Sequence, residues 1–248
     1  MKRLHFVALA LWAIGGAAMA AEIKVLSAGA VEPGLVRLAE AFRRETGQEV
    51  KIQFGTAPQL AKRLADGEAA DILIAPPAVV DEQVKSGKVV ADGRVVVGRV
   101  GVGVTVRAGV PDPNIATVDA LKQALLGADS VVYNRASSGI YLEQLFEKLG
   151  IAEQLKAKTT RYANGAQVLE HVIKGRGNEI GFGAITEIKL FAPKGLRFVG
   201  PLPAAVQNYT TYVAGVMVRA PAANAALEFV RYLGTPAARA AFATAGID

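Results

Sequence analysis

An alternation of strand and helix patterns is the feature of this 248-residue chain that most restricts its fold. Short apolar runs of four or five residues have the length of buried strands, and each is followed by a segment with helical periodicity. In 33–46, for example, one helical face carries Leu35, Leu38, Ala39 and Phe42, at i, i+3, i+4 and i+7. A β-α-β-α-β-α opening predicts an α/β fold with a largely parallel sheet. The predicted strands of this opening are 23–27, 50–54 and 72–75, and the predicted helices are 33–46, 58–66 and 78–86.

A valine-rich run at 95–106 is long for a single strand, and we predict that it crosses between two lobes. A second α/β series continues to about residue 200, and the β-prone run 209–218 is a candidate return crossing. Two lobes joined by two extended segments suggest a hinge with a cleft. We expect lobe I to comprise 21–101 plus 209–248, and lobe II to comprise 102–208. The other predicted elements are the helices 117–126, 139–149, 166–174, 223–233 and 236–245 and the strands 130–133, 159–162 and 180–183.

The first twenty residues have the layout of a secretory signal peptide. Lys2 and Arg3 precede an apolar stretch at 5–16, and Ala18-Met19-Ala20 is a small-x-small cleavage site. A membrane anchor is the alternative, but a spanning helix needs about 20 apolar residues, and this run is shorter. We therefore expect export, cleavage after Ala20 and a periplasmic location.

The composition restricts the possible chemistry. The chain has no cysteine and only two histidines, His5 and His171, which excludes thiolate and multi-histidine metal sites and a cysteine nucleophile. A Ser-His-Asp hydrolase would have to use His171. Basic residues are scattered and aromatic residues make up 6% of the chain, so there is no nucleic-acid signature. We expect a protein that is not an enzyme and that has no cofactor and no metal.

Four predicted strand-to-helix junctions carry small residues, at 28–30, 55–57, 136–139 and 164–165. Helix starts have unpaired backbone N–H groups and a partial positive charge, so they can bind anions. Ligands of open α/β sheets lie at the carboxyl ends of the strands. Two junctions from each lobe could therefore converge on one anion. Ordinary helix capping is the alternative interpretation of the same residues.

The stretches 24–30, 54–61 and 70–75 resemble the first lobe of periplasmic molybdate-binding proteins, and 138–141 and 181–184 fall at the later positions of that family. The resemblance covers essentially the whole mature chain. It implies a type II periplasmic binding protein fold, in which each of two lobes is a mixed, mostly parallel sheet flanked by helices and a two-strand hinge joins them. It also implies that the membrane permease of an ABC importer is a partner.

The resemblance also implies a ligand shell, from which this chain departs. Serine hydroxyls of the family correspond to Ala30 and to the loop 56–58, and a tyrosine hydroxyl corresponds to Ala184. The backbone donors correspond to Ser138 and Gly165. Because each lost partner in a buried polar site costs about 1–3 kcal/mol, the missing hydroxyls favour a small anion other than molybdate or tungstate.

Arginines at strand ends are candidate replacements for the missing hydroxyls. An arginine in the cleft, Arg135 or Arg161, would pair with a carboxylate or phosphate through two hydrogen bonds. A solvated surface charge is the alternative for each. We expect Ser137 to be the N-cap of its helix. The candidate ligand-binding residues are Ser27, Ala28, Gly29, Ala30, Thr56, Ala57, Arg135, Ser137, Ser138, Gly139, Asn164, Gly165 and Ala184.

These observations predict a monomeric exported solute-binding protein that captures a small anion, an oxyanion or a small carboxylate or phosphate, between two lobes and delivers it to an ABC transporter. A true molybdate- or tungstate-binding protein is one alternative. An exported hydrolase that uses carboxylates and a metal is another, and a ligand-sensing partner of a receptor is a third.

Overall fold

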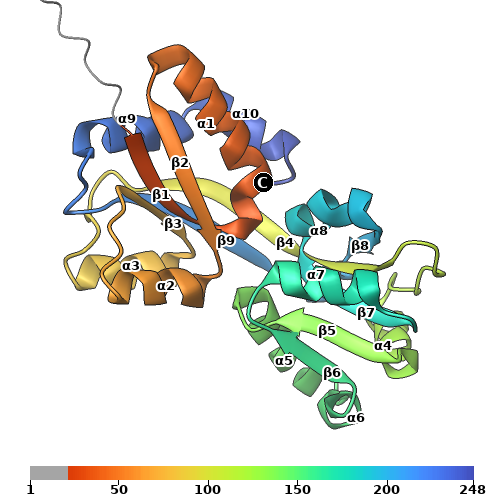
Figure 1. Cartoon of the computed structure of the whole chain (residues 1–248). Helices are drawn as coiled ribbons and strands as arrows, with labels where there is room; N and C mark the ends of the chain where they lie inside the picture. Colours follow the sequence, from red (N-terminus) through yellow and green to blue (C-terminus); the bar gives the residue numbers. More distant parts are fainter. Residues whose placement is uncertain (1–21) are drawn as a thin grey trace, which may run out of the picture.

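The structure, a computed structural model, describes residues 22–248, so the predicted signal peptide at 1–20 lies outside the described residues. The described chain forms two α/β lobes, which Figure 1 shows at the upper left and the lower right. No helix within 22–248 is long and apolar enough to span a membrane.

The first lobe contains the predicted parallel sheet. Strand β1 (Glu22–Ala28) lies between β2 (Glu49–Gly55) and β3 (Ile72–Ala75) and is parallel to both, and β9 (Tyr209–Val216) runs antiparallel to β3. Side chains that alternate along β1 and β3 enter two different apolar cores, one on each face of the sheet. The helices of one face are α1 (Glu32–Thr46), α9 (Ala223–Leu233) and α10 (Pro236–Thr244), and those of the other face are α2 (Ala57–Ala65) and α3 (Pro77–Lys85).

The second lobe repeats this arrangement. Strand β5 (Ser130–Asn134) is parallel to β6 (Thr159–Tyr162) and to β7 (Glu179–Ala184), and helices again cover both faces of the sheet. The helices are α4 (Val118–Gly127), α5 (Ser137–Lys148) and α6 (Ala152–Lys156) on one face, and α7 (Gly165–Lys174) and α8 (Ile185–Phe191) on the other. The predicted fold class is therefore confirmed.

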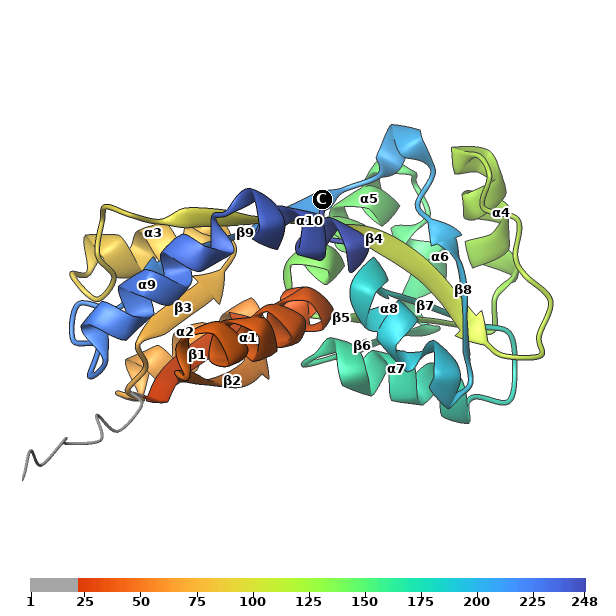
Figure 2. The ribbon, with the colours of Figure 1, turned by 90° about the horizontal axis from the view of Figure 1, so that it is seen from above.

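Strand β4 (Val95–Arg107) belongs to both sheets, as the valine-rich run predicts. Its residues 95–101 pair with β9 of the first lobe, and its residues 102–107 pair with β7 and β8 (Leu196–Pro201) of the second. Figure 2 shows β4 running from one lobe to the other, with the C-terminus near their junction.

The return connection differs from the prediction. Strand β9 has hydrogen-bonded neighbours on both sides, β3 and β4, so it is an internal strand of the first sheet. The chain returns through 202–208, which includes the short turn of helix Ala204–Val206. Here the Gln207 side chain accepts a hydrogen bond from the backbone N–H of Val102 and donates one to the Val102 carbonyl, both at 3.0 Å.

Three short elements were not predicted from the sequence: α6, α8 and β8. Helices α6 and α8 have five and seven residues, which is too few for a helical period to stand out. Helix α8 also follows β7 directly, so no turn residues mark its start. The turn of helix Ala192–Lys194 continues α8.

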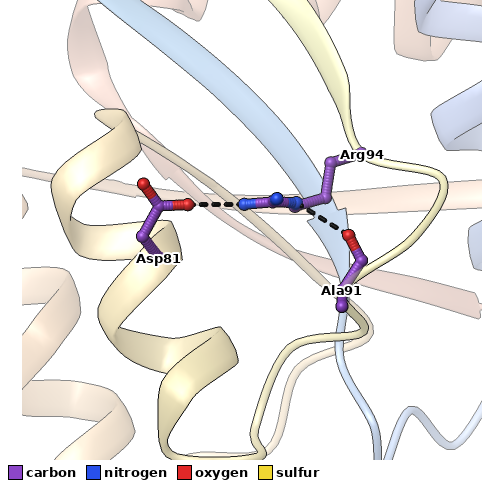
Figure 3. A network of polar contacts seen from close by, with 3 residues as sticks. All are labelled: Asp81, Ala91 and Arg94. Atoms are coloured by element: carbon purple, nitrogen blue, oxygen red, sulfur yellow. Dashed lines mark hydrogen bonds and ion pairs between the residues drawn. The ribbon is translucent and has the colours of Figure 1, made fainter.

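The loop that leads into β4 is fastened to α3 by one arginine (Figure 3). The Arg94 guanidinium lies 2.5 Å from the Asp81 carboxylate and donates a second hydrogen bond, of 2.9 Å, to the Ala91 carbonyl. This contact is partly exposed, so it adds little to stability, and it joins the residue before β4 to α3.

An aromatic cluster is a sensitive test of the first lobe's core. Phe42 is 1% exposed. The centroid of its ring lies 4.9 Å from the centroid of the Phe229 ring and 5.3 Å from that of the Tyr232 ring. We expect Phe42→Ala to lower the free energy of unfolding by about 3–5 kcal/mol, measured by urea denaturation. Val218→Ala, at a 54% exposed position, is the control. A loss below about 1 kcal/mol for Phe42→Ala would contradict this packing.

Candidate ligand site between the lobes

A small cavity lies where the two lobes meet. Its volume is about 50 Å³, enough for roughly three to five water molecules and hence for a small anion. Its walls come from the loops after β1, β2 and β5, the end of β7, the start of α7, and the middle of β4 and β9.

The structure brings nine of the thirteen candidate residues to this cavity. They come from all four junctions and from both lobes, so the junctions converge as the sequence predicts. The nine residues are Ala28, Gly29, Ala30, Thr56, Ala57, Ser137, Ser138, Gly165 and Ala184.

Four candidates are not in the cavity lining. Ser27 is fully buried, and its hydroxyl donates to the Ala28 carbonyl at 3.2 Å. Gly139 is buried against the Asn134 carbonyl, where any side chain would overlap that oxygen. Asn164 caps α7, because its side chain accepts a hydrogen bond from the Gln167 N–H at 3.0 Å. Arg135 is exposed.

The second arginine considered from the sequence, Arg161, also lies elsewhere. It forms an ion pair with Glu143, and its guanidinium lies 5.4 Å from the centre of the Tyr133 ring. These residues line a separate surface hollow. Among the described residues, the cavity lining contains no lysine, arginine or histidine.

Two of the hydroxyls in the lining are already engaged. The Thr56 hydroxyl donates to Gln59 Oε1 at 3.1 Å, and the same oxygen accepts from the Thr56 N–H at 2.8 Å. The Ser138 hydroxyl lies 3.2 Å from Asn134 Nδ2. These contacts order the loops, which is the capping role that was the alternative interpretation.

The prediction that Ser137 is the N-cap of α5 is wrong. The helix begins at Ser137, and Ala136 precedes it as the N-cap. Ala136 has no side chain that can cap the first turn, and its own backbone N–H donates to Oδ1 of the buried Asn134 at 2.9 Å. Ser137 is thereby left in the cavity wall.

Glu187 is the acidic residue of the lining, and it was not among the residues predicted from the sequence. It lies in the first turn of α8, between Gly29, which begins the short 3-10 helix Gly29–Val31, and Gly165, which begins α7 in the other lobe. A Cβ built on Gly29 would come within 2.8 Å of a Glu187 carboxylate oxygen, and one built on Gly165 would overlap the other oxygen. Glycine at both positions therefore leaves the space that this carboxylate occupies.

The environment of Glu187 disfavours its charged form. Burial, and then the charge of Glu32, raises the pKa of the Glu187 carboxyl group from its ordinary 4.5 to about 7. Within residues 22–248, no hydrogen bond or ion pair offsets these two effects. A carboxyl group in the first turn of a helix would ordinarily have a lowered pKa, so the helix start does not account for Glu187.

Tyr212 of β9 is a further lining residue that the sequence analysis missed. Burial, and to a smaller extent the charge of Glu187, raises the pKa of Tyr212, so its hydroxyl is a neutral donor at neutral pH. The only sequence signals for these two residues were weak. Tyr212 stands within a β-prone run, and Glu187 follows three residues after the end of a strand.

The lobes are also hydrogen-bonded to each other beside the cavity. The buried Thr186 hydroxyl of α8 donates to the Ala30 carbonyl at 2.6 Å. This bond holds Glu187, the next residue, against the loop after β1. Within 22–248, no three Asp, Glu, His or Cys side chains come together as metal ligands.

Two α/β lobes that share a strand and enclose a small cavity define the class of type II periplasmic binding proteins. A model of the family "Bacterial extracellular solute-binding protein" matches residues 23–248, and the chain belongs to this family. The family resemblance inferred from the sequence is confirmed.

The names of proteins similar to this chain refer to different small anions. A curated aconitate isomerase from Pseudomonas sp is 32% identical over 231 residues, which is 91% of this chain and 87% of that protein. The periplasmic molybdate-binding protein of Azotobacter vinelandii has a TM-score of 0.75 at 19% identity, covering 91% of this chain and 98% of that chain. The sulfate-binding protein SubI of Mycobacterium tuberculosis has a TM-score of 0.76 at 21% identity, covering 92% and 86%. These two structures show the fold that the chains share.

The raised pKa of Glu187 predicts a pH-dependent stability. Between pH 4.5 and 7 the folded protein keeps a proton that the unfolded chain has released, so the free energy of unfolding falls as the pH rises. We expect Glu187→Gln to remove this loss and to raise the free energy of unfolding at pH 8 by about 3 kcal/mol, with little change at pH 4.5. Urea denaturation at both pH values measures it.

The control for this measurement is Glu170→Gln on α7, an exposed carboxylate 3.5 Å from Lys174. It should change the free energy of unfolding by less than about 0.5 kcal/mol at either pH. If Glu187→Gln behaves like the control at pH 8, Glu187 does not have a raised pKa.

Proposed function

We propose that this protein is an exported solute-binding protein that captures a small organic carboxylate between its two lobes. The observation that carries the proposal is the cavity itself. Residues of both lobes line it, and they include residues at helix starts, where backbone N–H groups lack intrahelical partners, and the neutral Tyr212. Family membership supports solute capture as the general role.

The lining favours an organic acid over a tetrahedral oxyanion. Ala30 and Ala184 carry no hydroxyl, and the Thr56 hydroxyl is engaged with Gln59. In sulfate or molybdate the charge is spread over every oxygen, so the Glu187 carboxylate repels the ion in any orientation. A ligand with a hydroxyl, a protonated carboxyl or an apolar segment near Glu187 avoids this repulsion. The aconitate isomerase relative, whose name refers to a tricarboxylate, supports the same choice.

The proposed capture mechanism is a hinge motion. The pairing partners of β4 change between Gly101 and Val102, and the return connection ends where β9 begins at Tyr209. We place the lobe boundaries at these points, with lobe I at 21–101 and 209–248 and lobe II at 102–208. Rotation about them would open the cavity to solvent, and closure around the ligand would expel water.

We also propose where the protein acts and which partner receives its ligand. The leader at 1–20 would export the chain to the periplasm, where the monomer would deliver its ligand to the membrane permease of an ABC importer. The family supports this partner, and the mild positive charge of the chain, +6 with the leader included, suits an anionic cargo.

Conversion of the captured acid is a second candidate function. The observation that favours it is Glu187, a carboxyl group in the cavity with a pKa near 7, which is suited to accept and return a proton at neutral pH. The relative's name, an isomerase, agrees with a reaction that needs no second substrate.

Binding can be tested with probes of defined chemistry. We expect citrate, cis-aconitate or trans-aconitate to raise the melting temperature, and calorimetry to give a 1:1 stoichiometry. A ligand at about 100 times its Kd should add about 2.7 kcal/mol to the free energy of unfolding. Sulfate and molybdate should give no such rise. A response to molybdate or sulfate alone would make the protein an oxyanion binder, and no response to any of these anions would contradict the proposal.

A substitution in the cavity wall tests where the ligand binds. We expect Gly165→Asp to abolish the ligand-dependent rise, because the new carboxylate would overlap Glu187 and face the anion. Gly127→Asp is the matched control, since Gly127 is exposed and a Cβ there meets no atom within 4 Å. If the ligand stabilises Gly165→Asp as much as the wild type, it binds elsewhere.

A further inference from the structure

The inference concerns what Glu187 does to a bound ligand, and it rests on the proposed function. An unpaired carboxylate is costly to bury, so proteins usually pair it with a cation or several hydrogen-bond donors. Glu187 has neither partner within the described residues, and it lies against the cavity rather than away from it. The charged form of Glu187 therefore lowers the stability of the fold, and no ion pair or hydrogen bond compensates for it. Such a residue is typical of a functional site.

The surroundings of Glu187 leave it as the proton-exchanging group of the cavity. No lysine, arginine or histidine lines the cavity among the described residues, and Tyr212 keeps its proton at neutral pH. The groups that face Glu187 are Glu32 at the start of α1 and Tyr212 on β9. The charged residues of the adjoining surface hollow, which Glu187 also lines, are Glu32, Lys62, Arg63 and Asp66.

We infer that Glu187 is a catalytic acid–base residue that moves a proton between two carbons of a bound unsaturated polycarboxylate. In the first step a C–H bond next to the alkene breaks, an O–H bond forms on Glu187, and the electron pair spreads over the alkene and the adjoining carboxylate. In the second step the Glu187 O–H bond breaks and a new C–H bond forms two carbons away, so that the double bond has moved. The proton returns to the substrate, and no co-reactant is needed.

The rest of the cavity suits this reaction. The carbanionic intermediate places additional negative charge on a substrate carboxylate. The backbone N–H groups at the loop after β1 and at the start of α7 can stabilise that charge, as can the neutral Tyr212 hydroxyl. Aconitate is a suitable probe, because it carries a methylene group next to its alkene and one carboxylate on each of its three backbone carbons.

The proposed reaction can be followed by deuterium that enters the substrate from D2O, which gives a direct test. In D2O, proton transfer through a carboxyl group that exchanges with solvent replaces substrate hydrogens by deuterium, which proton NMR detects together with cis–trans conversion. We expect the wild-type protein to catalyse exchange into trans-aconitate. Glu187→Gln should lower the rate at least 100-fold while calorimetry still shows binding. Glu170→Gln, on the exposed side of α7, should leave both rate and affinity unchanged.

A pH profile separates a catalytic role from a positioning role. The wild-type rate should rise through a pH near 7 as Glu187 loses its proton, and Glu32→Gln should shift this rise to lower pH because Glu32 raises the pKa of Glu187. Binding of aconitate with neither exchange nor cis–trans conversion, or either reaction surviving in Glu187→Gln, would overturn the catalytic role and leave solute capture intact. Failure of citrate and both aconitates to bind would overturn the capture proposal and the catalytic role together.

Discussion

The sharing of β4 between two sheets is the constraint on which the rest of the structure depends. One continuous strand supplies hydrogen bonds to β9 in one lobe and to β7 and β8 in the other. The carboxyl ends of β1 and β2 therefore face those of β5 and β7 across a short gap, and the loops that follow them form its walls. The position of the cavity agrees with the topology, because ligands of open α/β sheets lie at the carboxyl ends of the strands.

Burial explains why most of this architecture could be predicted from sequence. Runs such as 72–75 are buried on both faces and so read as continuous apolar segments, while α1 shows its buried stripe at helical spacing. Gly29 and Gly165, two of the candidate residues, do line the cavity, because strand-to-helix loops of both sheets end there. Short elements show neither a continuous apolar run nor a helical period, so α8 was not predicted. Glu187, the residue that distinguishes this cavity chemically, lies in α8 and was therefore not predicted as a site residue.

Side-chain direction was the part that local sequence could not supply. Arg135 and Arg161 stand at strand ends, where a cleft-facing cation was one interpretation. The structure leaves Arg135 exposed and pairs Arg161 with Glu143. Ser137 is a residue type typical of an N-cap, yet it is the first residue of α5, and Ala136 before it is held by a hydrogen bond to the Asn134 side chain. For Arg161 the ion pair with Glu143 of α5 decides the outcome, and nothing in the local pattern around Arg161 indicates it.

The lining that results is unusual for an anion site, because it offers backbone and neutral donors together with one carboxyl group and no cation. A crystal structure of the protein with bound trans-aconitate tests this account most directly. The account predicts a ligand carboxylate within hydrogen-bond distance of the backbone N–H groups near Gly29 and Gly165, with an allylic carbon facing Glu187. A ligand held at the surface, or one whose carbons are remote from Glu187, would contradict it.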